Sequence, residues 1–134
     1  DVTYYGYGPY ESYSDKHRAS WVDRFDTTVD DMFEDYVFPQ ENGSHYNCQY
    51  ASVGNLYAKG KKPFSFQASR YSEKELDEKA HNFELVPSDG IYVALDYKQS
   101  GIGSNSCGPR LAEKYQLREE KIEWEISIRF DNKN

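Results

Sequence analysis

Strict alternation of apolar and polar residues near the C-terminus is the feature that most constrains the fold of this chain. From Lys121 to Phe130 the sequence reads KIEWEISIRF, which places five apolar side chains on one face and five polar side chains on the other. Because successive side chains of a β-strand point to opposite faces of a sheet, this pattern predicts a half-buried strand.

Three other stretches are predicted to be strands, because each combines β-favouring residues with a preceding turn sequence. They are Ile91–Tyr97 after PSDG, Phe64–Tyr71 after GKKP, and His45–Val53 after Asn42-Gly43. Strands joined by hairpin-length loops predict an antiparallel sandwich rather than an alternating α/β sheet.

One stretch, SEKELDEKA from Ser72 to Ala80, predicts a short helix. Ser72 and Glu75 have the spacing of a capping box, in which each side chain bonds a free backbone N–H of the first turn. Glu75 and Lys79 form a favourable i,i+4 pair. The predicted fold class is therefore mainly β, with one short helix.

Length and charge bound the domain count and the class of partner. With 134 residues the chain suits a single domain, residues 1–134, and is short for two. A formal charge of -7, with Lys and Arg clustered no further than pairs, argues against nucleic acid as a partner. The longest apolar run, Ile91–Leu95, is far shorter than the roughly 18 residues of a membrane span, so no membrane partner is expected.

Cysteine and histidine are sparse. Cys48 and Cys107 are too few for a disulfide framework, and both are expected to be reduced and unbonded. His17, His45 and His81 show no zinc-ligand spacing, so no metal site is expected.

The stretch GIGSNSCGPR, Gly101–Arg110, predicts a turn-rich loop after a strand. Its glycines do not have the spacing of a dinucleotide fingerprint, and a strand-like segment follows instead of a helix. Cys107 has no evident base partner, which favours an inert thiol over a nucleophile. The loop displays Ser104, Asn105, Ser106 and Cys107, which can bind a ligand that composition does not name.

The chain contains 13 tyrosines, which suit either sugar stacking or ordinary packing on half-exposed strands. Packing is favoured for most of them. The cluster YYGYGPYESY, Tyr4–Tyr13, stays open as a group of rings presented together by its Gly-Pro turn.

Four segments carry a resemblance to a known family: Tyr4–Asp15, Tyr36–Gly43, Phe64–Leu76 and Leu95–Pro109. In the same order they resemble the C-terminal small-chain domain, domain 5, of the β-galactosidases of glycoside hydrolase family 2. The resemblance implies an antiparallel β supersandwich of the galactose-mutarotase-like type, of which this chain corresponds to the C-terminal half. The start at Asp1 without a methionine fits a piece of a longer protein or a processed form.

The resemblance implies hydrolysis of terminal β-D-galactosides, such as lactose, with retention by two glutamates on a separate TIM-barrel domain. Glu11 and Glu41 match motifs of the terminal domain itself, and hydrogen bonding in turns and loops is expected for them. The isolated chain is expected to be inactive scaffold without cofactors, while other domains bind the magnesium and sodium ions of the family. Its expected partners are those domains or a large subunit, the galactoside through the parent enzyme, and a second copy in a homo-oligomer. A cytoplasmic location is expected, with an exported parent as the alternative.

In the resembled family a tryptophan shortly after Gly-Ile-Gly contacts the sugar at the rim of the active site. Cys107 or a neighbouring position takes its place here, so Ser104, Asn105, Ser106 and Cys107 are the expected substrate-binding residues. Trp21 and Trp124 lie elsewhere in the sequence and do not substitute.

Two other classes of function remain open. A stand-alone carbohydrate-binding module would explain a sandwich rich in tyrosine, and would bind galactosides in isolation. A mutarotase-like sugar epimerase would need His17, His45 or His81 to meet a carboxylic acid in a pocket.

Overall fold

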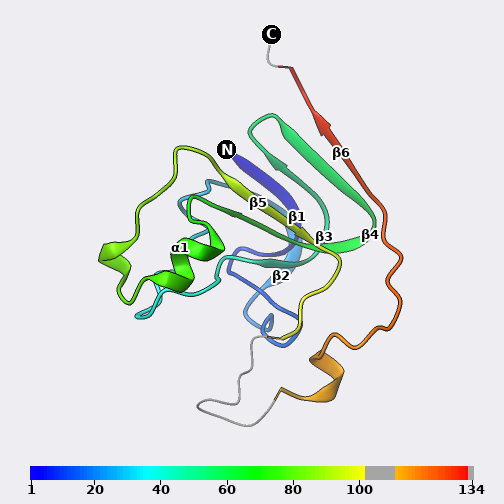
Figure 1. The fold of residues 1–134 in the computed structure, drawn as a ribbon. Helices are drawn as coiled ribbons and strands as arrows, with labels where there is room; N and C mark the ends of the chain where they lie inside the picture. Colours follow the sequence, from blue (N-terminus) through cyan, green and yellow to red (C-terminus); the bar gives the residue numbers. More distant parts are fainter. Residues whose placement is uncertain (102–110, 133–134) are drawn as a thin grey trace.

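The computed structural model describes residues 1–101 and 111–132. They form one six-stranded antiparallel sheet with the strand order β2-β1-β3-β4-β5, and β6 also pairs with β4 (Figure 1). The strands are β1 (Val2–Gly8), β2 (Trp21–Thr27), β3 (His45–Val53), β4 (Leu56–Ser69), β5 (Tyr92–Asp96) and β6 (Ile126–Phe130). The helical elements are α1 (Glu73–Glu78) and two 3-10 turns, η1 (Asn82–Glu84) and η2 (Glu113–Tyr115).

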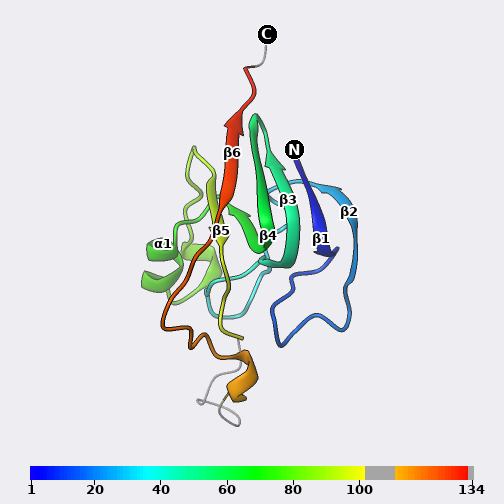
Figure 2. The ribbon, with the colours of Figure 1, turned by 90° about the vertical axis from the view of Figure 1, so that its right-hand side faces the viewer.

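The longest strand, β4, has three partners. A tight turn at Gly54 joins it to β3, where the backbone takes the left-handed conformation with φ 58° that glycine adopts without strain. On its other edge β4 pairs with β6 from Leu56 to Gly60 and with β5 from Ser65 to Ser69. Figure 2 shows this arrangement, with β5 and β6 on the same side of β4 and β1 and β2 on the other.

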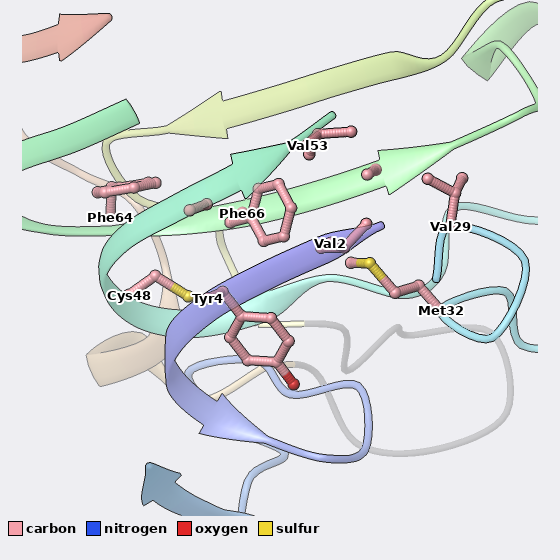
Figure 3. Close-up of a cluster of buried hydrophobic side chains, with 10 residues drawn as sticks. Val2, Tyr4, Val29, Met32, Cys48, Val53, Phe64 and Phe66 are labelled. Atoms are coloured by element: carbon pink, nitrogen blue, oxygen red, sulfur yellow. The ribbon is translucent and has the colours of Figure 1, made fainter. Parts of the chain in front are cut away.

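The core lies on one face of the sheet (Figure 3). In β1 the residues alternate between buried and half-buried positions, and Val2 and Tyr4 point into the core. Phe64 and Phe66 of β4 join them, and both are almost fully buried. The segment after β2 covers part of this face with Val29 and Met32.

The fold class predicted from the sequence is confirmed, since the described chain is mainly β and antiparallel with one short helix. The strand predicted at His45–Val53 coincides with β3, and β5 lies within Ile91–Tyr97. The strand predicted at Phe64–Tyr71 corresponds to the second half of β4, which ends at Ser69. β4 is longer than predicted because its first half, which begins at Leu56, pairs with β3 and β6. None of the described helices is long and apolar enough to cross a membrane.

Helix α1 begins where the sequence predicts. The Ser72 side chain accepts a hydrogen bond from the Glu75 backbone N–H at 3.0 Å. The Glu75 carboxylate instead accepts from the Val86 N–H at 2.9 Å, so it ties the helix to the segment before β5 rather than closing a capping box. The helix ends before Lys79, which is extended.

The alternating segment at the C-terminus differs from its prediction. Only Ile126–Phe130 forms a strand: its ladder with β4 ends at the pair Gly60↔Ile126, and β5 begins to pair with β4 only at Ser65. Half-burial is also wrong at its end: Ile128 is 51% exposed and Phe130 is 67% exposed. Both share the core face with Leu56, through the pairs Leu56↔Phe130 and Ala58↔Ile128, and form an uncovered extension of the core.

This uncovered extension predicts self-association of the chain in solution. Changing Ile128 and Phe130 together to Thr removes two large apolar side chains, each worth about 1.5–3 kcal/mol when buried. We expect sedimentation equilibrium to show association weakened at least about tenfold. Lys59→Thr, on the opposite face, is the control. A wild-type chain that is monomeric and binds no hydrophobic dye would contradict the prediction.

Candidate functional site

The substrate-binding residues predicted from the sequence, Ser104, Asn105, Ser106 and Cys107, lie outside the described residues. The structure describes the two segments that flank them. The first ends at Gly101, after β5, and the second begins at Leu111 and enters η2. In both Figure 1 and Figure 2, η2 lies beyond the C-terminal end of β5. We call these two flanking segments, residues 99–101 and 111–117, the loop base.

Gln99 joins the loop base to the rest of the sheet. Its side-chain oxygen accepts a hydrogen bond from the Ser44 hydroxyl at 3.1 Å. Its side-chain nitrogen donates to Glu41 at 3.0 Å and to Asp96 at 3.1 Å. One amide therefore connects the end of β5 to the segment that leads into β3.

The two sides of the loop base are bonded to each other. The Gly101 N–H donates to the Tyr115 carbonyl at 2.9 Å, and the Leu117 N–H donates to the Ser100 hydroxyl at 3.1 Å. A Cβ atom at Gly101 would overlap the carboxyl group of Asp15, so a larger residue here would displace that side chain.

A buried carboxylate, Glu11, organises the neighbouring segment. It is only 7% exposed and accepts hydrogen bonds from Lys16 at 2.6 Å, from the Gly43 N–H at 3.0 Å and from Tyr36. Burial raises the pKa of the Glu11 carboxyl, but the hydrogen bonds from these three groups outweigh burial and hold that pKa below its usual range. Both Glu11 and Glu41 thus show the hydrogen-bonding role expected from the sequence.

A second group of carboxylates lies beside Gln99. Burial, and then the charge of Asp96, raises the pKa of Glu41. Burial, and then the charge of Glu73, raises the pKa of Asp96. Within residues 1–101 and 111–132, no three His, Cys, Asp or Glu side chains are placed to hold a metal ion.

The described cysteine is a packing residue. Cys48 is a free thiol that is fully buried in β3, and burial raises its pKa to about 12. It is therefore neither a nucleophile nor a metal ligand at neutral pH. Cys107 lies outside the described residues.

The three histidines lie in three different places. His45 is in the core, where burial lowers its pKa to about 4 and its ring donates to the Tyr7 carbonyl at 3.0 Å. His81 pairs with Glu84 on the surface at 3.4 Å. His17 lines a hollow with two carboxylates, Glu11 and Glu34, and Glu11 already accepts hydrogen bonds from Lys16, Tyr36 and the Gly43 N–H. This arrangement gives an epimerase little support.

The cluster Tyr4–Tyr13 is divided by the fold. Tyr4 and Tyr13 are buried, as the packing interpretation predicts. Tyr5 and Tyr7 point to the other face of the sheet, where Tyr7 stacks on Tyr46 at 5.8 Å between ring centroids. The cluster does not present its rings together.

The sequence analysis missed a cavity of about 490 Å³ beside the loop base. It is lined from β3, from the middle of β4, from the end of β5 and from η2. No local motif could have shown it, because its walls are far apart in the sequence.

The geometry defines a class: an antiparallel β scaffold that holds the base of a loop and carries no evident catalytic set among its described residues. Comparison with known families then gives the assignment. The family model described as beta galactosidase small chain matches residues 1–130, and the chain belongs to this family.

Individual relatives agree with this assignment. A beta-galactosidase of Actinobacillus pleuropneumoniae is 50% identical over 130 residues, which are 97% of this chain and 12% of that protein. A beta-galactosidase of Staphylococcus xylosus is 43% identical over 96% of this chain and 13% of its own length. One from Vibrio cholerae is 33% identical, again over 96% of this chain and 12% of its own length. The chain thus spans about an eighth of these relatives.

The Glu11 cluster predicts a pH dependence of stability. Because the folded pKa of Glu11 lies below its ordinary value of 4.5, this group stabilises the fold above that pH, and the contribution is lost as the pH falls through the folded pKa. Glu11→Gln should lower the free energy of unfolding at pH 7 by about 3 kcal/mol and by less at low pH.

Urea unfolding at several pH values measures this effect. Burial lowers the pKa of His45, which also weakens the fold in acid; the Glu11 charge is the smallest influence on that pKa, so most of the His45 contribution is common to both proteins. Glu123→Gln breaks an exposed pair with Lys121 and should change stability by less than about 0.5 kcal/mol. A difference for Glu11→Gln that does not shrink in acid would contradict the role assigned to this carboxylate.

Proposed function

We propose that this chain is the C-terminal scaffold part of a glycoside hydrolase family 2 β-galactosidase. The parent enzyme would hydrolyse terminal β-D-galactosides, such as lactose, with retention. One observation carries the proposal. Nearly the whole chain aligns with proteins named beta-galactosidase, yet the aligned part makes up only 12% of the Actinobacillus pleuropneumoniae protein and 13% of the Staphylococcus xylosus protein.

Bond cleavage is assigned to residues outside this chain. Retention requires two carboxyl groups about 5 Å apart, one as acid and base and one as nucleophile. In the described residues the buried Glu11 and the exposed Glu41 are engaged in hydrogen bonds to neighbouring segments. We therefore assign the two catalytic glutamates, and the magnesium and sodium ions, to other domains of the parent.

The loop 102–110 is proposed to lie at the rim of the galactoside site. The loop base supports this role, because hydrogen bonds of Gln99, Gly101 and Ser100 fix where the loop leaves and rejoins the sheet. Ser104, Asn105, Ser106 and Cys107 would then offer hydrogen bonds to the leaving-group side of the substrate.

Other domains of the parent, or a second subunit, are the proposed cover of the uncovered extension. Leu56, Ile128 and Phe130 continue the core face beyond the segment that covers it. A large apolar surface of this kind is normally buried in a complete protein. A cytoplasmic location remains part of the proposal.

Kinetics of the full-length parent tests the assignment. Changing Asn105 and Cys107 together to Ala should alter kcat and KM by about tenfold to a hundredfold on lactose and on an aryl galactoside, since one such contact is worth about 1–3 kcal/mol. The two-glutamate chemistry should persist. Asn55→Ala, in the β3–β4 turn, is the control and should leave both constants unchanged.

Two results would contradict the proposal. Unchanged kinetics of the double variant on both substrates would place the loop outside the active site. Turnover of a β-galactoside by the isolated 134-residue chain would show that the catalytic groups lie within it.

A further inference from the structure

The cavity beside the loop base lies at a gap in the strand pairing along one edge of β4, between the residues that pair with β6 and those that pair with β5. The ladder between β4 and β6 ends at Gly60, and the ladder between β4 and β5 begins at Ser65. The intervening residues of β4, from Lys62, form one wall of the cavity, and η2 and its following residues form another. Its volume of about 490 Å³ suits a mono- or disaccharide.

We propose that this cavity binds a sugar ring that carries an anionic group, either a phosphate or a carboxylate. The proposal goes beyond the rim loop and does not depend on it, because all the residues that carry it are described. Three independent features of the cavity support it: its aromatic rings, an unpartnered buried hydroxyl beside a distorted strand, and its charge.

Three tyrosines supply apolar surface. Tyr46, Tyr97 and Tyr115 all line the cavity and are half-buried. Tyr97 packs against Trp124 at 6.4 Å between centroids. Lys98 lies over the Tyr97 ring and Lys114 over the Tyr115 ring, at 5.3 and 4.7 Å from the ring centroids. Each of these rings therefore offers its other face to the apolar C–H face of a sugar, whose hydroxyls remain available to polar groups.

One polar group at the cavity is left without a partner, and a neighbouring residue has an uncommon backbone conformation. The Ser14 hydroxyl is buried, lines the cavity and has no hydrogen-bond partner among the described residues. Asn47 sits in an irregularity of β3 with a left-handed backbone, φ 58°, which is uncommon for a residue other than glycine. Unsatisfied hydroxyls and strained backbone both occur preferentially at binding sites.

The charge of the cavity opposes that of the chain. Lys62, Lys98 and Lys114 line it, although the whole chain has a formal charge of -7. Glu119 is the one carboxylate among its described lining residues, and it pairs with Lys98. Among the described residues Lys62 and Lys114 form no ion pair, and the Lys114 ammonium lies 4.7 Å from the centroid of the Tyr115 ring, so both charges are left for a phosphate or carboxylate.

Fluorescence of Trp124 offers a direct test, because its ring touches the cavity-lining Tyr97. Trp21→Phe, in exposed β2, leaves Trp124 as the single indole. The chain is titrated with galactose 6-phosphate, galacturonate, galactose and inorganic phosphate. We expect a saturable change with at least one of the two charged sugars, at least about tenfold tighter than with galactose or phosphate. The stronger of the two charged sugars identifies the anionic group.

Matched variants separate the site from general charge. Lys62→Gln with Lys114→Gln should weaken binding of the charged sugar at least about tenfold. Lys59→Gln with Lys74→Gln changes the net charge equally outside the cavity and should leave binding unchanged. Ser14→Ala should weaken binding about threefold to tenfold, and thermal melting verifies that each variant is folded.

Four results would overturn the proposal. Equal affinity for inorganic phosphate would show an adventitious ion only. Equal affinity for galactose would show that the lysines do not select the ligand, as in a neutral carbohydrate-binding module. Equal losses in both lysine pairs would show a general charge effect, and no saturable response to either charged sugar would show that the cavity binds neither.

Discussion

β4 pairs with two different strands along one edge, and this arrangement positions both the cavity and the loop base. One strand of 14 residues carries β6 on its first part and β5 on its last part, while β3 pairs with it along the other edge. Gly60 stands at the division, where a Cβ atom would overlap the Lys62 carbonyl group. The cavity opens at this point, and the loop base begins just beyond the end of β5.

Two polar side chains, Glu11 and Gln99, connect the segment before β3 to the loop base. The buried Glu11 carboxylate accepts hydrogen bonds from Lys16, Tyr36 and the Gly43 N–H, and these bonds fix the segment before β3. Gln99 then bonds that segment through Ser44 and Glu41. Because a buried carboxylate is stable only when its hydrogen bonds are made, this segment has one favoured arrangement.

Local patterns in the sequence predicted the elements that depend on local physics. β-Favouring residues after the Asn42-Gly43 turn located β3, and the Ser72 cap located α1. The resemblance, carried by ordered motifs, gave the family that the comparison then established. For the proposed substrate-binding residues Ser104 to Cys107 the sequence remains the only source, since they lie outside the described residues.

Features that depend on distant partners could not be predicted. The alternation from Lys121 to Phe130 is unbroken, yet only its last five residues form a strand, and their ladder with β4 ends at Gly60, before the residues that pair with β5. The apolar face at Ile128 remains open, since no described segment reaches it. The cavity joins residues as distant as Ser14 and Glu119, and only the folded sheet brings them together.

Hydrogen bonds of the loop base tie both flanks of the segment 102–110 to the sheet and to each other. Amide hydrogen exchange at Gly101 and Leu117 tests this claim most directly, because these two N–H groups bond the Tyr115 carbonyl and the Ser100 hydroxyl across the loop base. We predict that both amides exchange at least about a hundredfold more slowly than in an unstructured peptide. We also predict that Gln99→Ala accelerates both without affecting the β3–β4 hairpin. Exchange of both amides at the unstructured rate in the unaltered chain would contradict the claim.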